Sequence, residues 1–189
     1  MHCQSATDHG GGTGCADPLL RRLLEPRMER GDEVSVGIIV YSRTGHTLSV
    51  ARRLEERLAA EGHDVTLEQL ETVEPLDLSA TTAALKETPP IERYDVVVFG
   101  SPVNGGRMSA PMRTYLDRIP SLQGQTVMLL LTHFFPRVWG ANQTIEEMTE
   151  VCASKGATVS GSGNVRWTSL RRGRQIANAV ESLSSCLEG

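Results

Sequence analysis

Residues 34–41 read Val-Ser-Val-Gly-Ile-Ile-Val-Tyr, a run that is nearly all apolar and rich in β-branched side chains. A strand of this composition fits the interior of a parallel sheet whose two faces are both covered by helices. The apolar period then changes, because Thr47, Ala51 and Leu54 fall on one face of a helix. A buried strand followed at once by an amphipathic helix is the repeating unit of an α/β fold.

The same alternation of strand and helix continues to the end of the chain, which predicts a parallel sheet. Residues 63–70 are less apolar than the other strand candidates, so we expect that strand near an edge. Thr144 and Glu147 have the spacing of a capping box and predict a helix that starts there. Strands are expected at 34–41, 63–70, 95–100, 126–131 and 158–167, and helices at 47–62, 79–86, 109–119, 144–155 and 171–187.

Residues 1–32 differ from the rest of the chain, because no apolar period holds across them and residues 10–14 are glycine-rich. We expect a flexible N-terminal tail at 1–32 and one folded domain at 33–189, and Met28 is an alternative start of the native protein. A metal site in the tail is a second reading, but its ligands match no usual zinc spacing. Those ligands would be His2, Cys3, His9 and Cys15.

Composition argues against several functional classes of protein. The net charge of −4 argues against a general nucleic-acid binder, because such proteins neutralise phosphates with Lys and Arg. No apolar run approaches the roughly 20 residues of a membrane helix, so no membrane partner is expected. Four cysteines in 189 residues do not form a disulfide scaffold, and a reducing cytoplasm is the expected location.

The turn after the first strand carries hydroxyl groups and a glycine at the start of a helix. Helix N-termini bind phosphate through free amides and the positive end of the helix dipole. The spacing matches neither a Walker loop nor the dinucleotide pattern G-x-G-x-x-G. An ordinary capped helix is the alternative, since Ser and Thr are common where helices start. The candidate residues are Ser42, Arg43, Thr44, Gly45, His46 and Thr47.

This turn resembles the FMN phosphate loop of flavodoxin-like proteins, and the order of elements from residue 33 to about 187 is also similar to theirs. The resemblance implies a three-layer α/β sandwich with a five-stranded parallel sheet of order 2-1-3-4-5. It also implies FMN as the cofactor, held by three loops at the carboxyl edge of the sheet. In that family the other two loops follow the third and fourth strands.

By this resemblance, the second loop runs along the isoalloxazine edge and the third supplies aromatic stacking partners. A glycine-rich connection without a ligand is the alternative for the second loop, and a small local core is the alternative for the third. Trp167 is assigned to packing. The candidate residues are Pro102, Val103, Asn104, Gly105 and Gly106 in the second loop, and Thr132, His133, Phe134, Phe135 and Trp139 in the third.

The resemblance implies an FMN redox protein, and two roles remain open. One is an electron carrier that docks on a redox partner protein, and the other is an enzyme that reduces a quinone-like acceptor with NAD(P)H. The alternative outside the redox proteins is a doubly wound binding or signalling module without flavin. We assign no catalytic side chain and no metal ligand, and the oligomeric state stays open.

Overall fold

The computed structural model describes residues 33–77 and 79–187. The expectations for the tail, for a start at Met28 and for a metal site among residues 1–32 lie outside the described residues. No helix in the described part of the chain has the length and apolar character that crossing a bilayer requires.

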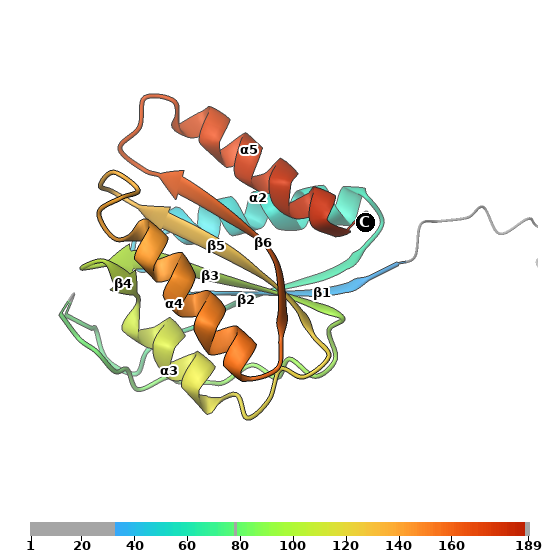
Figure 1. Ribbon diagram of the computed structural model, residues 1–189, viewed down its shortest axis with the longest axis horizontal. Coiled ribbons are helices and arrows are strands. Elements are labelled where there is room, and N and C mark those ends of the chain that lie inside the picture. Colours follow the sequence, from blue (N-terminus) through green and yellow to red (C-terminus); the bar gives the residue numbers. More distant parts are fainter. Residues whose placement is uncertain (1–32, 78, 188–189) are drawn as a thin grey trace, which may run out of the picture. The chain divides into compact units, whose positions relative to one another are not determined.

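Five parallel strands form the central sheet, in the order β2-β1-β3-β5-β6 (Figure 1). Counted along the parallel strands alone, this is the predicted order 2-1-3-4-5, so the flavodoxin-like fold is confirmed. A short strand, β4, pairs antiparallel with the end of β3 and was not predicted. The bounds are β1 Ser35–Val40, β2 Asp64–Gln69, β3 Val96–Asn104, β4 Arg107–Met108, β5 Thr126–His133 and β6 Thr158–Arg166.

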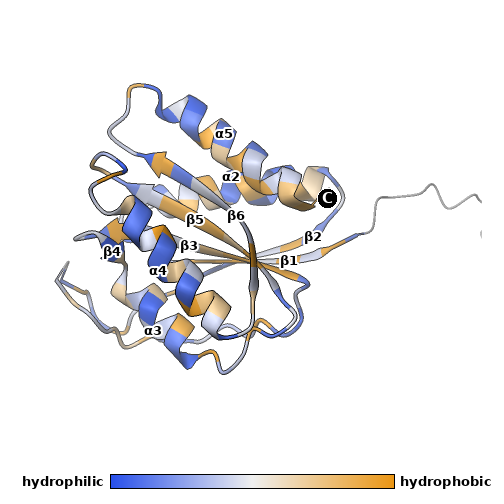
Figure 2. Ribbon diagram, viewed as in Figure 1, coloured by the Kyte–Doolittle hydropathy of each residue, from blue (hydrophilic) through white to orange (hydrophobic). Residues whose placement is uncertain are grey.

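Helices cover both faces of the sheet and give the three expected layers. One core lies under α2 and α5, and the second lies under α3 and α4. Figure 2 shows that the apolar residues follow the central strands, while the outer sides of the helices are hydrophilic. The bounds are α2 His46–Ala60, α3 Ala110–Arg118, α4 Ala141–Ser154 and α5 Arg172–Ser184, followed by a 3-10 turn at Ser185–Leu187.

The alternation of side chains along β1 explains why its sequence is almost continuously apolar. Val36, Ile38 and Val40 enter the core under α2 and α5, whereas Ile39 enters the core under α3 and α4. The edge strand β2 has no fully buried residue, which agrees with its weaker apolar signal. Both faces of an interior parallel strand are therefore filled, as its composition predicts.

The crossover between β2 and β3 corrects the prediction of a helix at 79–86. The described residues of 71–93 form turns, bends, irregular backbone and one isolated bridge between Thr72 and Leu85. Pro75, Pro89 and Pro90 lie outside 79–86 and limit how far a helix there could extend. The crossover is fixed by tertiary packing, because Leu85 and Ile91 are buried in the core under α3 and α4.

The predicted capping box at Thr144 is also wrong. Helix α4 begins at Ala141 with Gly140 as its N-cap, so Thr144 lies inside the first turn. Its hydroxyl donates to the Gly140 carbonyl oxygen at 2.8 Å. Glu147 does not reach back to an N-cap amide but accepts a hydrogen bond from the Met108 amide of β4. Thr144 is therefore bonded within its own helix, and Glu147 is bonded to a tertiary partner.

Candidate functional site

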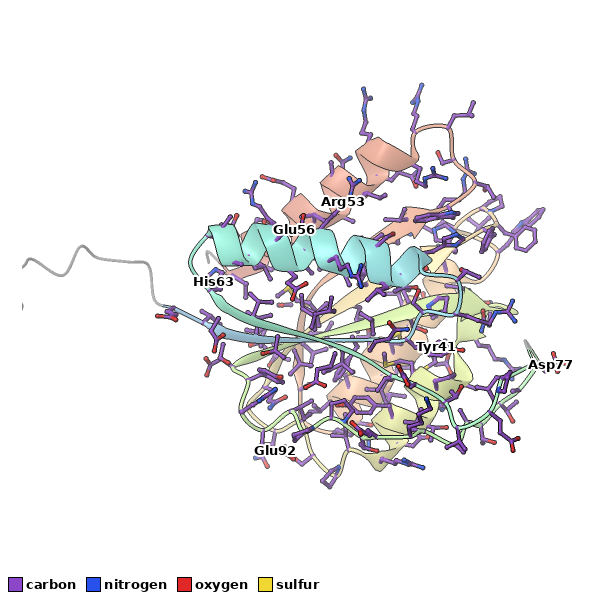
Figure 3. All side chains as sticks on the ribbon, turned by 180° about the vertical axis from the view of Figure 1, so that it is seen from behind. Tyr41, Arg53, Glu56, His63, Asp77 and Glu92 are labelled. Carbon is purple, nitrogen blue, oxygen red and sulfur yellow. The ribbon has the colours of Figure 1, made fainter. Side chains whose placement is uncertain are left out.

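One cavity of about 600 Å³ opens at the carboxyl end of the parallel strands. In Figure 3 this end is marked by Tyr41, while His63 lies at the other end of the sheet. The cavity's size is typical of a site for a small molecule or cofactor. Its lining comes from all three predicted loops and from the end of β6: Ser42, Arg43, Thr44, His46, Thr47, Pro102, Val103, Asn104, Gly105, Thr132, Phe134, Phe135, Pro136, Arg166 and Thr168.

Most of the predicted site residues therefore lie around one cavity, and four do not line it. Gly45 and Gly106 are backbone positions beside the cavity, in its first and second loops. His133 and Trp139 flank Phe134 and Phe135 in the third loop.

The start of α2 favours a free amide site over a capped helix. Gly45 is the N-cap, with a φ of 80°, and no side chain caps the helix. A positive φ is a conformation that favours glycine, and it lets the chain turn tightly before the first helical amides. The amides of the first turn are thus left without a side-chain partner, as a helix N-terminus that binds an anion requires.

Two hydroxyl groups of the first loop have hydrogen-bond partners within the protein, and a third has none among the described residues. Thr47 Oγ1 lies 2.8 Å from Thr132 Oγ1, so this pair ties the first loop to the end of β5. Thr44 Oγ1 lies 3.1 Å from His46 Nδ1. Ser42 Oγ is buried and has no hydrogen-bond partner among the described residues. A buried hydroxyl without a partner is costly unless a ligand satisfies it.

These donors suit the phosphate of FMN. The free amides, the Ser42 hydroxyl and the dipole of α2 all favour a negatively charged group. Arg43 adds a positive charge to the same part of the cavity lining. The residues of this loop could therefore hold a phosphate without a metal ion.

The second loop is a β-hairpin and not an irregular connection. Residues Pro102 to Asn104 continue β3, and β4 returns beside them. The tight turn is made by Gly105 and Gly106, with φ values of 56° and 80°. Two adjacent residues with positive φ are typical of a two-residue hairpin turn.

The hairpin is held against the start of α4 by close backbone packing. A Cβ atom on Gly140 would lie 2.3 Å from Gly106 Cα, so only glycine fits there. Glu147 Oε2 accepts a hydrogen bond from the Met108 amide at 3.2 Å. The other Glu147 oxygen lies 3.2 Å from Arg113 Nη1 of α3. The second and third loops are thereby fixed to each other.

In the third loop, two aromatic rings face the cavity and one histidine does not. Phe134 and Phe135 line the cavity. His133 is buried, and its Nδ1 donates to the Phe135 carbonyl oxygen at 2.6 Å, which holds the loop backbone. Trp139 packs beside Phe135, with ring centroids 6.2 Å apart.

Sequence reasoning missed Pro136, Arg166 and Thr168 as lining residues. Arg166 ends the fifth parallel strand, β6, and Thr168 follows it, and the carboxyl ends of parallel strands meet at one edge. That rule could have placed both of them at the site. The Arg166 Nε atom is buried and has no hydrogen-bond partner among the described residues.

Trp167, which the sequence assigned to packing, stacks on His46 beside the cavity. Their ring centroids lie 3.9 Å apart with an interplanar angle of 20°. The Arg172 guanidinium also packs over the Trp167 ring, 4.7 Å from its centroid. Burial, with a smaller contribution from the Arg172 charge, lowers the pKa of His46. His46 therefore favours its neutral form next to the first loop.

A model of NADPH-dependent FMN reductases matches residues 35–168 of the chain. This span includes all three loops around the cavity and runs through Thr168 at its rim. It begins at the first residue of β1 and leaves out α5.

The chain matches solved structures with the same fold over nearly the whole length of each of them. A flavoprotein in complex with FMN from Lactobacillus acidophilus NCFM is 17% identical, with a TM-score of 0.57, and the match covers 77% of this chain and 98% of that one. The Megasphaera elsdenii flavodoxin is 22% identical, with a TM-score of 0.53 and coverages of 77% and 97%. A WrbA-like flavodoxin from Agrobacterium tumefaciens is 16% identical, with a TM-score of 0.57 and coverages of 82% and 98%.

Proposed function

Because the chain belongs to the family of NADPH-dependent FMN reductases, we propose that it is an oxidoreductase that uses FMN to transfer electrons from NAD(P)H to a quinone-like acceptor. It is an FMN-binding flavodoxin-like redox protein. Bound FMN supplies the redox chemistry between the reduced nicotinamide and the acceptor. The chain's own residues bind the cofactor, orient it and leave room for the substrates.

The first loop is the proposed phosphate site. The Ser42 hydroxyl and the uncapped amides at the start of α2 donate to the phosphate. The contact between Thr47 and Thr132 fixes this loop to β5, so the donors are in place before the cofactor binds. Preorganised donors bind an anion more strongly, because no ordering entropy is spent on binding.

The second and third loops are the proposed sites of the isoalloxazine ring. Phe134 and Phe135 offer stacking surface on the side of the third loop. On the side of the hairpin, the lining residues are the smaller Pro102, Val103, Asn104 and Gly105. Gly105 allows the hairpin peptide to change orientation at low cost, because it has no Cβ atom.

The observation that favours an enzyme over a carrier is that the phenylalanine rings line one side of the cavity, while the hairpin side has small residues. Only the third loop lends phenylalanine rings to the cavity lining, and the hairpin lends none. A nicotinamide ring, and then a quinone, needs such open space over the flavin. No separate nicotinamide-binding domain is present among the described residues, so NAD(P)H would bind directly over FMN.

The test is NAD(P)H consumption by the FMN-loaded chain, with and without a soluble quinone. We expect oxidation of NAD(P)H that depends on the quinone. If dithionite reduces the bound FMN but neither NADPH nor NADH does, the enzyme proposal is wrong. The carrier role would then stand, with a redox partner protein as the donor.

A matched pair of variants tests the phosphate site. Gly45→Asp places a carboxylate beside the proposed phosphate, and we expect FMN affinity and NADPH turnover to fall together. Gly124→Asp is the control, because Gly124 has a φ of 81° against 80° for Gly45, and neither would crowd a neighbour within 4 Å. Equal FMN affinity in the two variants would contradict this phosphate site.

A further inference from the structure

Exposed apolar side chains are concentrated at one end of the molecule. Among the described residues, six large hydrophobic side chains are exposed, and all but Val73 lie in the two loops that follow β5 and β6. Soluble proteins rarely expose apolar residues in such a group unless it binds something. The residues of the group are Phe134, Phe135, Val138, Trp139 and Leu170.

Cofactor binding does not account for the whole group. Phe134 and Phe135 line the cavity, so a bound flavin can cover them. Val138, Trp139 and Leu170 lie outside the cavity lining and are 72%, 68% and 106% exposed. These three residues, together with the exposed Arg137, Arg171 and Arg174, are called the loop-tip surface below.

The two loops that carry the loop-tip surface are joined to each other. The Trp167 amide donates to the His133 carbonyl oxygen at 2.7 Å. Thr168 Oγ1 donates to the Phe134 carbonyl oxygen at 2.6 Å. Figure 1 shows the loop before α4 and the loop before α5 side by side at the carboxyl end of the sheet. The apolar tips are therefore presented together.

The loop-tip surface is positively charged, although the whole chain carries a charge of −4. Residues 132–145 and 158–180 contain no Asp or Glu, so no carboxylate in these segments neutralises the arginines. Arg171 and Arg174 also lie at the N-terminus of α5, where the helix dipole opposes positive charge. An anionic partner would remove this repulsion.

We propose that the loop-tip surface docks on an anionic lipid bilayer. Val138, Trp139 and Leu170 enter the interface between headgroups and acyl chains, and Arg137, Arg171 and Arg174 contact lipid phosphates. Apolar and tryptophan side chains flanked by basic residues are typical of segments that lie at a membrane surface. Such docking is peripheral and needs no membrane-spanning helix, so it departs from the sequence-based expectation of no membrane partner, which rested on the lack of a spanning segment.

Charge and shape favour a bilayer over the other occupants. A second copy docked through the same surface would bring the two sets of arginines together, and this repulsion opposes a symmetric dimer. The 2′-phosphate at the adenosine end of NADPH could pair with the arginines, but NADPH would not cover apolar side chains on two separate loop tips. A bilayer satisfies the charge and the apolar tips at once.

Docking on a bilayer indicates that the electron acceptor is a quinone dissolved in the membrane. Phe134, Phe135 and Thr168 belong to the same two loops and line the cavity, so its rim is brought to the lipid surface. A quinone dissolved in the bilayer could then reach the flavin without crossing water. This last step rests on the proposed function, whereas the docking itself does not.

The test is cosedimentation of the full-length chain, with FMN added, on phosphatidylcholine vesicles and on vesicles that contain phosphatidylglycerol as well. We expect binding only to the anionic vesicles, weakened by salt. Arg171→Gln with Arg174→Gln should weaken it roughly 30-fold, since a basic residue near such a surface contributes about 1 kcal/mol. Trp139→Ser with Leu170→Ser should weaken it at least tenfold.

Matched controls separate docking from general adsorption. Val73→Ser removes an exposed apolar side chain elsewhere, and Arg52→Gln with Arg53→Gln removes two exposed charges from α2. Both controls should bind like the wild type. The proposal is overturned if the wild type stays in solution, if Trp139→Ser with Leu170→Ser binds normally, or if the controls weaken binding as much as the loop-tip variants.

Quinone reduction measured in water keeps the two proposals separate. A wild-type chain that oxidises NADPH but does not bind the anionic vesicles would refute only the docking. Vesicle binding without NADPH oxidation would refute only the proposed enzyme.

Discussion

Ser42 and His46 show what single residues contribute to the first loop. The Ser42 hydroxyl is buried without a partner among the described residues, which is a cost that a phosphate oxygen can offset. His46 stacks on Trp167 and has a lowered pKa, so it adds ring surface rather than charge beside the site. The sequence predicted both residues as cofactor contacts, but neither the missing partner of Ser42 nor the stack on Trp167 is visible in a local pattern.

Replacing Ser42 by Ala should weaken FMN selectively. A hydrogen bond to a charged group contributes roughly 1.5–3 kcal/mol, so we expect a loss of about 10- to 100-fold in FMN affinity. Riboflavin lacks the phosphate, and its affinity should be unchanged. Fluorescence titration with both flavins measures the difference. An equal loss for riboflavin would place the Ser42 hydroxyl away from the phosphate.

Replacing His46 by Gln should reduce the dependence of stability on pH in the flavin-free chain. Burial lowers the pKa of His46 in the folded state, so the unfolded state binds the proton more readily. The stability that this group contributes is present above its unfolded pKa and is lost as the pH falls through the lower folded value. Urea unfolding at pH 7.5 and pH 5 should show a larger decrease for the wild type than for the variant, and equal decreases would contradict this.

Strands and helices at this site are joined by contacts that local sequence patterns do not encode. The hairpin of β3 and β4 rests on the start of α4 through Gly106 and Gly140. The Glu147 carboxylate of α4 binds the Met108 amide of β4. This explains why the capping-box pattern at Thr144 failed, since its glutamate has a tertiary partner. The crossover helix failed for a related reason, because buried contacts of residues such as Leu85 override weak helical periodicity.

Replacing Gly140 by Ala should destabilise the junction between the hairpin and α4. The new Cβ would lie 2.3 Å from Gly106 Cα, and the φ of 116° is unfavourable for alanine. We expect a loss of roughly 2–3 kcal/mol in the free energy of unfolding, together with weaker FMN binding.

Gly124→Ala is the matched control for this prediction. Gly124 has a φ of 81° but no atom near its Cβ position, so it isolates the backbone strain of about 1 kcal/mol. Chemical denaturation of both variants gives the comparison. Equal losses would show that the contact between Gly106 and Gly140 does not matter.

At the scale of the whole molecule, the order of the parallel strands places the site. The order β2-β1-β3-β5-β6 brings the carboxyl ends of β1, β3, β5 and β6 around one cavity. Strand composition predicted a parallel sheet, because buried parallel strands have a strong signal, and the resemblance to flavodoxin-like proteins implied this order. The sequence did not predict the contribution of Arg166 and Thr168, whose local sequence has no motif and whose position depends on the assembled sheet.

Binding of FMN should stabilise the whole domain, because the three loops come from separate parts of the chain. A ligand at 100 times its dissociation constant adds about 2.7 kcal/mol to the free energy of unfolding. The melting temperature should therefore rise with FMN concentration. It should not rise with riboflavin to the same extent, since the proposed phosphate donors then stay unused.

The most direct test of the account is the flavin content of the full-length chain after incubation with FMN and removal of free ligand by gel filtration. Visible absorbance and protein concentration together give the ratio of flavin to chain. We predict one FMN retained per chain and a flavin spectrum perturbed by the aromatic rings of the third loop. A chain that retains no flavin and melts at the same temperature with and without FMN would contradict the account.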